Sequence, residues 1–386
     1  GAPSGVHLHY AGTHTDRIQS TDPFDEATVD PTVEIDGSPT ILDQEISGLF
    51  VLRKTATETI LEGSDLTVDL MVGPQRVLLA ENGTGTFVLI DGDLAGTASL
   101  TITDGPVLPN IDISGSTIEL ALNTTSGAVA SVTGEPLDLP AGPSYRLSGN
   151  AVVQLGIPDV SLVADFLFEP RDTDMNPGNG NEEIFLSAEN LEFEFDDGLA
   201  AVLQVSNGSG AFVINDQGIA GTATGDVALA VPGIGLTGLF TIELNDTGVL
   251  QSVDLGGMPV VLAAGPFLRV KADDAELDVL GVTMTGDFAF EQRETDSGGE
   301  KVVTLAANDV SLPLGTLTSD LITFENGSGL FLLTSAGVAG EASGDVSVGV
   351  PEVGLSGTLD LAINTTEAAV METIDLGGGP QLLDVQ

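Results

Sequence analysis

Apolar and polar residues alternate along most of the chain. In the stretch 338–350 one parity carries Val, Ala and Gly, whereas the other carries mainly Glu, Ser and Asp. The stretches 236–244 and 355–363 alternate in the same way. A period of two predicts β-strands with one buried and one solvated face. No stretch combines a helical period with caps, so the pattern predicts an all-β protein.

Turn-forming dipeptides separate these stretches. They are Asn-Gly, Asp-Gly, Pro-Gly and Gly-Gly steps. Asn and Gly accept positive φ, so we expect the steps to form tight hairpin turns between antiparallel strands.

Several short motifs recur in the same order with a period of about 120 residues. Asn-Gly-Thr/Ser-Gly begins at Asn82, Asn207 and Asn326, and Asn-x-Thr begins at Asn123, Asn245 and Asn364. Ala-Gly-Pro occurs at 141–143 and 264–266, and Asp-Phe-x-Phe-Glu occurs at 165–169 and 287–291. The motifs predict three copies of one unit at 41–156, 157–278 and 279–386, after an atypical segment 1–40.

The third copy stops before its last motif. Residues 376–380 match 255–259, which lead to the Ala-Gly-Pro at 264–266, but the sequence ends at Gln386 without a third Ala-Gly-Pro. This pattern predicts that the chain is an excerpt from a longer array within a larger protein.

The repeats favour an elongated, repetitive antiparallel architecture, either one continuous sheet or a β-solenoid. No Pro/Ser-rich linker separates the copies, so the strand pattern continues through each boundary. Serial β-sandwich domains are the alternative, because a unit of about 120 residues is a suitable domain size.

The composition narrows the possible partners. The chain has 10 Lys and Arg against 58 Asp and Glu, a net charge of −48. Such a chain repels nucleic acid and anionic membrane surfaces. It has no Cys, and no apolar run approaches the roughly 20 residues of a transmembrane helix. The acidic charge predicts that the protein lies outside the cell, in saline or calcium-rich surroundings. The alternative is that the charge only keeps a hydrophobic β protein soluble.

The motifs Asn-Gly-Ser/Thr-Gly-x-Phe, Gly-x-Phe-x-Phe and Asn-Thr-Thr over residues 41–386 resemble the long repeats of giant, secreted, adhesin-like bacterial surface proteins. The resemblance implies a role at the cell surface or in an extracellular matrix such as that of a biofilm. It transfers no functional residue.

Two groups of residues are candidate metal ligands. Asp172, Asp174, Asn176 and Glu183 occupy positions one, three, five and twelve of a calcium loop. The position that should hold Gly carries Pro177, so an acidic hairpin loop without metal is the alternative.

The three histidines, His7, His9 and His14, are the second group, with Asp16 as a possible fourth ligand for a transition metal. A solvated terminus is the alternative reading of this cluster.

Other polar patterns have simpler explanations. The sequons at Asn82, Asn123, Asn207, Asn245, Asn326 and Asn364 are acceptors for N-glycans or, as we favour, turn residues at fixed repeat positions. The carboxylate pairs Asp196-Asp197 and Glu192/Glu194 are explained by a solvated strand face.

No phosphate loop, nucleophile elbow or zinc-protease motif occurs, so we predict that the chain is not an enzyme. The sequence predicts a structural or adhesive region of a large extracellular or cell-surface protein, stiffened by Ca²⁺ or forming filaments. Self-association would use edge strands or segment 1–40. The alternative is a binding module with an apolar β groove or face for a lipid or glycan.

Overall fold

The computed structural model describes 7–9, 32–42, 44–54, 58–72, 75–103, 111–115, 117–132, 135–157, 160–172, 182–231, 233–255, 259–279, 282–294, 301–316, 319–335, 337–348, 354–366, 369–374 and 381–385. Every regular element among these residues is a β-strand. The prediction of an all-β protein is therefore confirmed. None of the described residues forms a helix of the length and apolarity needed to cross a membrane.

The strands before residue 160 are β1 (His7–His9), β2 (Thr32–Gly37), β3 (Thr40–Ile41), β4 (Gln44–Lys54), β5 (Thr59–Val72), β6 (Gln75–Ile90), β7 (Asp93–Thr103), β8 (Ile111–Gly115), β9 (Ile118–Asn123), β10 (Val129–Val132), β11 (Glu135–Leu139) and β12 (Ser144–Leu155). Those up to residue 279 are β13 (Ser161–Asp172), β14 (Glu182–Asp196), β15 (Ala201–Asn215), β16 (Gly218–Leu229), β17 (Ile234–Asn245), β18 (Gln251–Asp254), β19 (Pro259–Leu262) and β20 (Phe267–Val279). The remaining ones are β21 (Val282–Glu294), β22 (Lys301–Thr316), β23 (Ser319–Thr334), β24 (Gly337–Val348), β25 (Leu355–Asn364), β26 (Val370–Ile374) and β27 (Gln381–Val385).

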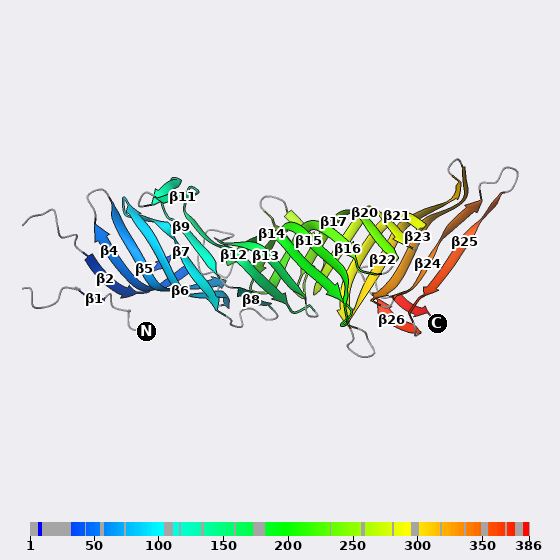
Figure 1. The fold of residues 1–386 in the computed structure, drawn as a ribbon, viewed down its shortest axis with the longest axis horizontal. Coiled ribbons are helices and arrows are strands. Elements are labelled where there is room, and N and C mark those ends of the chain that lie inside the picture. The colour runs from blue at the N-terminus through cyan, green and yellow to red at the C-terminus, as the bar shows by residue number, and fades with distance from the viewer. Residues whose placement is uncertain are drawn as a thin grey trace, which may run out of the picture. The chain divides into compact units, whose positions relative to one another are not determined.

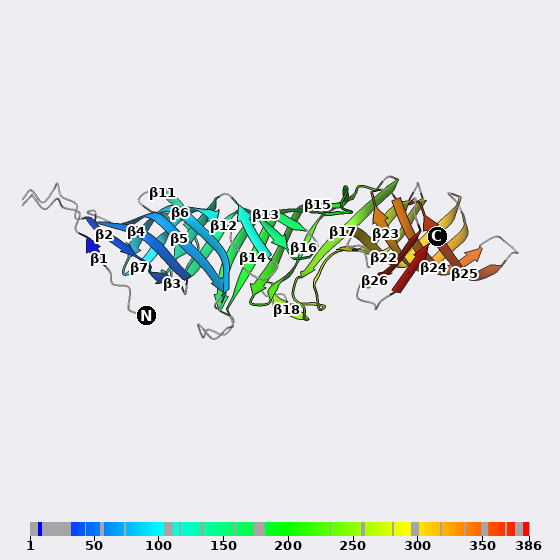
Figure 2. The ribbon, with the colours of Figure 1, turned by 90° about the horizontal axis from the view of Figure 1, so that it is seen from below.

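The chain forms two compact units. Unit 1 takes its described residues from 1–108, 112–152 and 165–186, and unit 2 takes them from 109–111, 153–164 and 187–386. In unit 1, antiparallel pairing runs β1–β2–β4–β5–β6–β7–β9–β12. In unit 2 it runs β15–β16–β17–β20–β21–β22–β23–β24–β25 (Figures 1 and 2).

These strands belong to one large antiparallel sheet, so the prediction of a continuous sheet is confirmed. The repeated motifs meet at equivalent pairings within it. An Ala-Gly step follows each Asn-Gly-Thr/Ser-Gly motif, at 95–96, 220–221 and 339–340. Each step pairs with the Asn-x-Thr motif of its own copy, as Ala95↔Asn123, Ala220↔Asn245 and Ala339↔Asn364. This common register aligns the three copies residue by residue and supports a repeat-like architecture.

The Asn-Gly steps of the repeat are not hairpin turns, contrary to the sequence-based prediction. Asn82, Asn207 and Asn326 lie inside β6, β15 and β23, with φ of 55°, 51° and 53°. The pairing register shifts beside each of them, which identifies a β-bulge. The left-handed conformation that a turn requires is used here to bend a strand. The Asp91-Gly92 step does form the turn between β6 and β7, with φ of 53° and 100°.

A second set of bulges lies on the neighbouring strand of each copy. Asp65, Asn190 and Asp309, on β5, β14 and β22, have φ of 51°, 54° and 50°. Asp and Asn tolerate this conformation better than other residues with a Cβ. Paired bulges on adjacent strands bend the sheet in the same place, because each bulge kinks its strand and increases the local twist.

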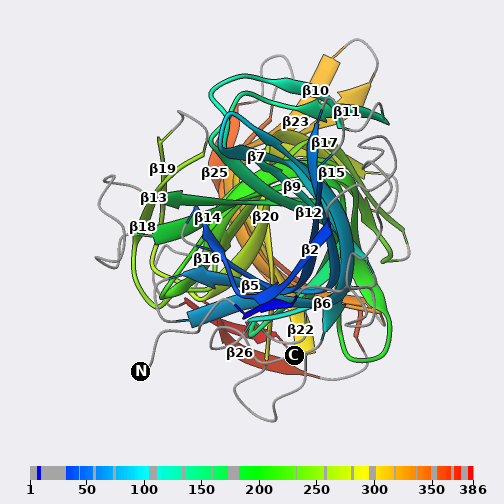
Figure 3. The ribbon, with the colours of Figure 1, turned by 90° about the vertical axis from the view of Figure 1, so that its left-hand side faces the viewer.

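The curved sheet buries apolar side chains on one face along its length. Phe87 and Leu120 of unit 1, and Phe212, Ile242 and Phe290 of unit 2, are at most 1% exposed. Small hairpins cover part of the opposite face. Val129 and Leu139 of the β10–β11 hairpin pack with Val88 and Ala95, outside the strands β7 and β9 (Figure 3), and Leu383 and Val385 of β27 pack with Val302 and Leu332.

The glycine after each bulged Asn permits a close approach between strands. A Cβ on Gly83, Gly208 or Gly327 would lie 2.9 Å from the Cβ of Leu66, Leu191 or Val310, the residue after the neighbouring bulge. Backbone oxygens of Leu191 and Thr224 lie 3.0 and 3.1 Å from that position at Gly208. The contact cannot be relieved by rotating a side chain.

We predict that Gly208→Ala lowers the free energy of unfolding by about 1–3 kcal/mol, the usual cost of overpacking. This cost outweighs the gain from restricting the unfolded chain. Urea denaturation monitored by circular dichroism measures the change. Gly248→Ala is the matched control, because no atom lies within 4 Å of its Cβ position. Equal midpoints for the two variants would show that the close approach is unimportant.

Candidate functional site

The structure describes only part of the candidate calcium loop. Asp172 ends β13 and Glu183 lies in β14, whereas Asp174 and Asn176 lie outside the described residues. His7 and His9 belong to β1, and His14 and Asp16 lie outside the described residues. In the part of the chain that is described, no group of three or more His, Cys, Asp or Glu side chains is arranged to hold a metal ion. Both metal sites remain predictions.

The Asn-x-Thr motif forms a buried polar turn at the end of β9 and of β17. The Asn123 amide nitrogen donates to the carbonyl oxygens of Gly127 and Pro140 at 2.8 and 2.7 Å, and its Oδ1 accepts from the backbone and hydroxyl of Thr125. Asn245 makes the same contacts with Val249, Ala263 and Thr247. Both asparagines are 0% exposed. A glycan cannot be carried at these two positions, and their role is structural.

The middle residue of this turn differs between copies. Thr124 Oγ1 accepts a 2.8 Å hydrogen bond from the Leu94 amide, and Thr365 Oγ1 accepts one of the same length from Val338. The equivalent residue of the second copy is Asp246, which is 8% exposed and whose Oδ2 has no hydrogen-bond partner among the described residues. Burial raises the pKa of Asp246 to about 6.

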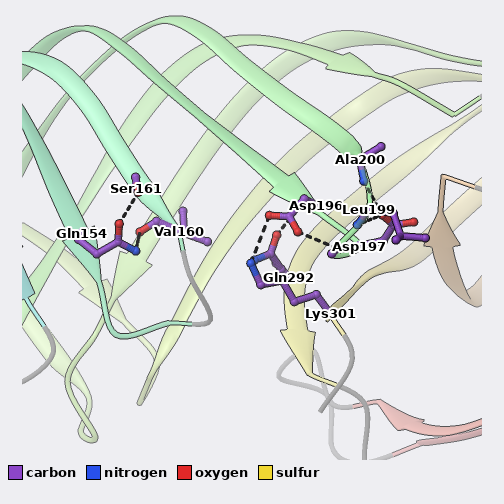
Figure 4. A network of polar contacts seen from close by, with 10 residues as sticks. Gln154, Val160, Ser161, Asp196, Asp197, Leu199, Ala200, Gln292 and Lys301 are labelled. Carbon is purple, nitrogen blue, oxygen red and sulfur yellow. Dashed lines mark hydrogen bonds and ion pairs between the residues drawn. The ribbon is translucent and has the colours of Figure 1, made fainter. Parts of the chain in front are cut away.

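The acidic pair Asp196-Asp197 has specific partners, so the prediction of a merely solvated face was incomplete. Asp196 forms an ion pair with Lys301 at 3.4 Å, and its backbone amide donates to Gln292 at 2.5 Å (Figure 4). Asp197 Oδ2 accepts from both the backbone amide and the hydroxyl of Ser335 at 2.7 Å. The turn after β14 is therefore held against β21, β22 and the turn between β23 and β24.

The pKa of Asp197 reflects these contacts. Burial alone would raise the pKa, but hydrogen bonds from Ser335, Ala200 and Leu199 stabilise the carboxylate and lower the pKa to about 2. The group stays ionised at every physiological pH. Its hydrogen bonds hold the turn after β14 to Ser335, and we assign Asp197 a structural role rather than that of a general acid or base.

An apolar cavity of about 230 Å³ lies in unit 2 between β20–β22 and β23–β25. Its wall includes Met284 and Phe288 of β21, Phe324 and Phe331 of β23, and Leu361 of β25. Ser328 and Thr365 are the only polar side chains in the lining, which contains no carboxylate, imidazole or amine. This composition suits an apolar molecule and provides no base to activate a nucleophile. The sequence analysis offered an apolar β groove as an alternative but did not locate it, because the position of the cavity depends on how the sheet bends.

We predict that Asp246→Thr stabilises the protein above pH 6. The raised pKa means that the folded protein carries a poorly solvated carboxylate above pH 6, whereas the unfolded chain solvates it. The cost falls as the pH decreases through 6 and is absent below about pH 4, where both states are protonated. The gain in unfolding free energy should be about 1 kcal/mol or more at pH 7.5, the usual cost of an unsatisfied buried group.

Thermal unfolding at pH 7.5 and pH 4 measures this effect, with exposed Asp273→Thr as the matched control. A gain of the same size at both pH values would contradict the assignment to a buried charge.

Comparisons of the chain with protein-family models, with curated proteins and with solved structures found no match.

Proposed function

We propose that the chain is a non-enzymatic structural region of an extracellular or cell-surface protein, in which repeated strand units extend a single sheet. One observation carries the proposal: hydrogen bonding passes directly from one predicted copy to the next. The predicted boundary after residue 278 falls at the end of β20, one residue before the strand stops, and β20 pairs with β21 from Arg269↔Glu291 to Val279↔Val282. A boundary of this kind fixes the orientation of one copy relative to the next, whereas a flexible linker does not.

The side chains at this boundary strengthen the connection. Arg269 forms a 2.5 Å ion pair with Glu291, and both side chains are at most 14% exposed. Arg146 and Glu169 form the equivalent pair between β12 and β13 at 2.6 Å. Such partly shielded ion pairs fix the register between copies. The apolar faces on both sides of the boundary are buried together, so each copy stabilises its neighbour.

The surface chemistry agrees with a role outside the cell. A net charge of −48 keeps a β-rich protein from non-specific association, and dissolved cations screen the self-repulsion in a saline exterior. The resemblance to adhesin-like surface repeats supports the same location.

The cavity in unit 2 favours a second candidate function, the binding of a small apolar molecule. Its volume of about 230 Å³ is below the roughly 300–1,000 Å³ typical of drug-sized pockets. It exceeds the roughly 150 Å³ that accommodates benzene in an engineered protein cavity. A single ring or a short acyl segment fits this space, whereas a whole phospholipid does not.

We predict that inserting a second copy of residues 157–278 after residue 278 gives a folded protein with a longer sheet. The insert repeats the β18–β19 hairpin and six strands of the large sheet, β13, β14, β15, β16, β17 and β20. Six strands at about 4.8 Å each extend the sheet by up to about 29 Å in its hydrogen-bonding direction. Small-angle X-ray scattering measures the increase in maximum dimension. A variant with a Gly/Ser linker between β20 and β21 is the control, and a duplicated copy that scatters like this flexibly linked control would contradict the proposal.

For the second candidate, we predict that toluene, a single neutral ring, binds saturably in isothermal titration calorimetry. Val346→Phe fills part of the cavity and should weaken toluene binding by about tenfold or more, a loss of at least 1.4 kcal/mol. Val261→Phe, at a valine that is 66% exposed on β19, should leave binding unchanged. Equal toluene binding by both variants would place the ligand elsewhere and remove this candidate.

A further inference from the structure

The strand β25, at the end of the pairing order of the large sheet in unit 2, leaves apolar side chains exposed at positions that are buried in the earlier copies. Leu359 and Leu361 of β25 are 45% and 54% exposed. The common register makes them equivalent to Ile118 and Leu120 of β9, and to Phe240 and Ile242 of β17. Those four side chains are at most 7% exposed.

The difference lies in the pairing of the strands. β9 has β7 on one edge and β12 on the other, and β17 lies between β16 and β20. In the part of the chain that the structure describes, β25 pairs with β24 alone. The cavity of unit 2 lies beside this edge, since Leu359, Leu361 and Ile363 form part of its wall.

The earlier copies show which kind of strand covers this edge. Tyr145 and Leu147 of β12 lie opposite Leu122 and Leu120. Leu268 and Val270 of β20 occupy the same positions opposite Leu244 and Ile242. An arginine stands between the two apolar residues in each strand, as Arg146 and Arg269.

The Ala-Gly-Pro motif before each covering strand packs directly on the Asn-x-Thr turn. A Cβ on Gly142 would lie 2.2 Å from the Asn123 carbonyl oxygen, and one on Gly265 would lie 2.0 Å from that of Asn245. Only glycine fits there. The third copy forms the same turn, because Asn364 Oδ1 accepts from the backbone and hydroxyl of Thr366 at 3.0 and 2.6 Å.

Charge at the edge favours the arginine of the covering strand. The position opposite that arginine is Ala362 in the third copy, by analogy with Ala121 and Glu243. Two exposed carboxylates flank this position. Asp360 lies two residues before Ala362 on β25, and Glu341 is the residue of β24 that pairs with Ala362. A guanidinium placed there has acidic neighbours, as Arg269 has in Glu243 and Glu291.

We propose that the free edge of β25 binds a strand of the β12 and β20 type, in which Ala-Gly-Pro is followed by one residue and then by apolar, Arg and apolar residues. The strand adds antiparallel to β25, covers Leu359 and Leu361, and places its glycine on the turn at Asn364. The inference rests on the proposed structural function and identifies the partner that extends the sheet.

The test uses the full chain and a fluorescent peptide with the sequence of residues 262–277. We expect saturable one-to-one binding by fluorescence anisotropy, with slowed amide hydrogen exchange confined to residues 355–364. Leu361→Thr should weaken binding by about tenfold or more, because it removes the apolar contact at the centre of the edge. Leu382→Thr, at a leucine that is 63% exposed on β27, is the matched control and should bind as the unchanged chain does.

Two altered peptides test the recognised features. Gly265→Val should abolish binding by colliding with the Asn364 turn, and Arg269→Glu should weaken it by repulsion from Asp360 and Glu341. Equal binding of the original and altered peptides would overturn the proposal, as would protection outside β25. Concentration-dependent protection of β25 without peptide would also overturn it, in favour of pairing between two copies of this chain.

The peptide experiment tests the strand-binding edge, and the duplication experiment tests the structural function, so a negative result in one does not decide the other. A duplicated chain that folds with a longer sheet but binds no peptide refutes only the strand-binding edge. A duplicated chain whose added copy folds apart refutes the structural function, whatever the peptide does.

Discussion

The left-handed backbone conformation at the bulged Asn and Asp residues is the constraint on which the rest of the structure depends. Each copy has one bulge at Asp65, Asn190 or Asp309 and a second on the next strand at Asn82, Asn207 or Asn326. The glycine after the second bulge lets the two strands approach, and together they bend the sheet. Bending separates an apolar face that buries Phe87 and Phe212 from a face partly covered by small hairpins. Without these bulges, a long antiparallel sheet would be less strongly bent.

Curvature also explains contacts between residues that are distant in sequence. Asp197 reaches Ser335 at 2.7 Å although 138 residues separate them, because the sheet of unit 2 bends enough to bring the turn after β14 to the turn after β23. Asp196 and Lys301 meet in the same region. A flat sheet would keep these strands several strand widths apart. The polar contacts therefore stabilise the bend that the bulges produce. The low pKa of Asp197 is a consequence of these hydrogen bonds.

Alternation predicted the all-β fold, and the recurring motifs predicted its repeat-like architecture, because both are local properties of the sequence. The same local patterns misplaced the Asn-Gly steps, since positive φ at Asn serves a bulge and a turn equally well. The choice between them depends on whether the neighbouring strand continues past the step, as β7 does beside Asn82. The partners of Asp197 and the apolar cavity were beyond prediction for a related reason. Both arise from curvature summed over several strands, and no short motif encodes that sum.

The same geometry explains why the ends of such a sheet matter most for function. Inside the sheet, β9 and β17 are paired on both edges and bury most of their apolar side chains, so the interior offers few places for a ligand. The exposed side chains of β25 differ from their buried equivalents in β9 and β17 because no described strand lies on their open edge. The cavity has β25 in its wall for the same reason. An incoming strand that carries the apolar and basic pattern of β12 would bury these side chains and narrow the cavity at once. Sheet extension and uptake of an apolar molecule would then compete for the same surface, so that a bound strand excludes the small ligand.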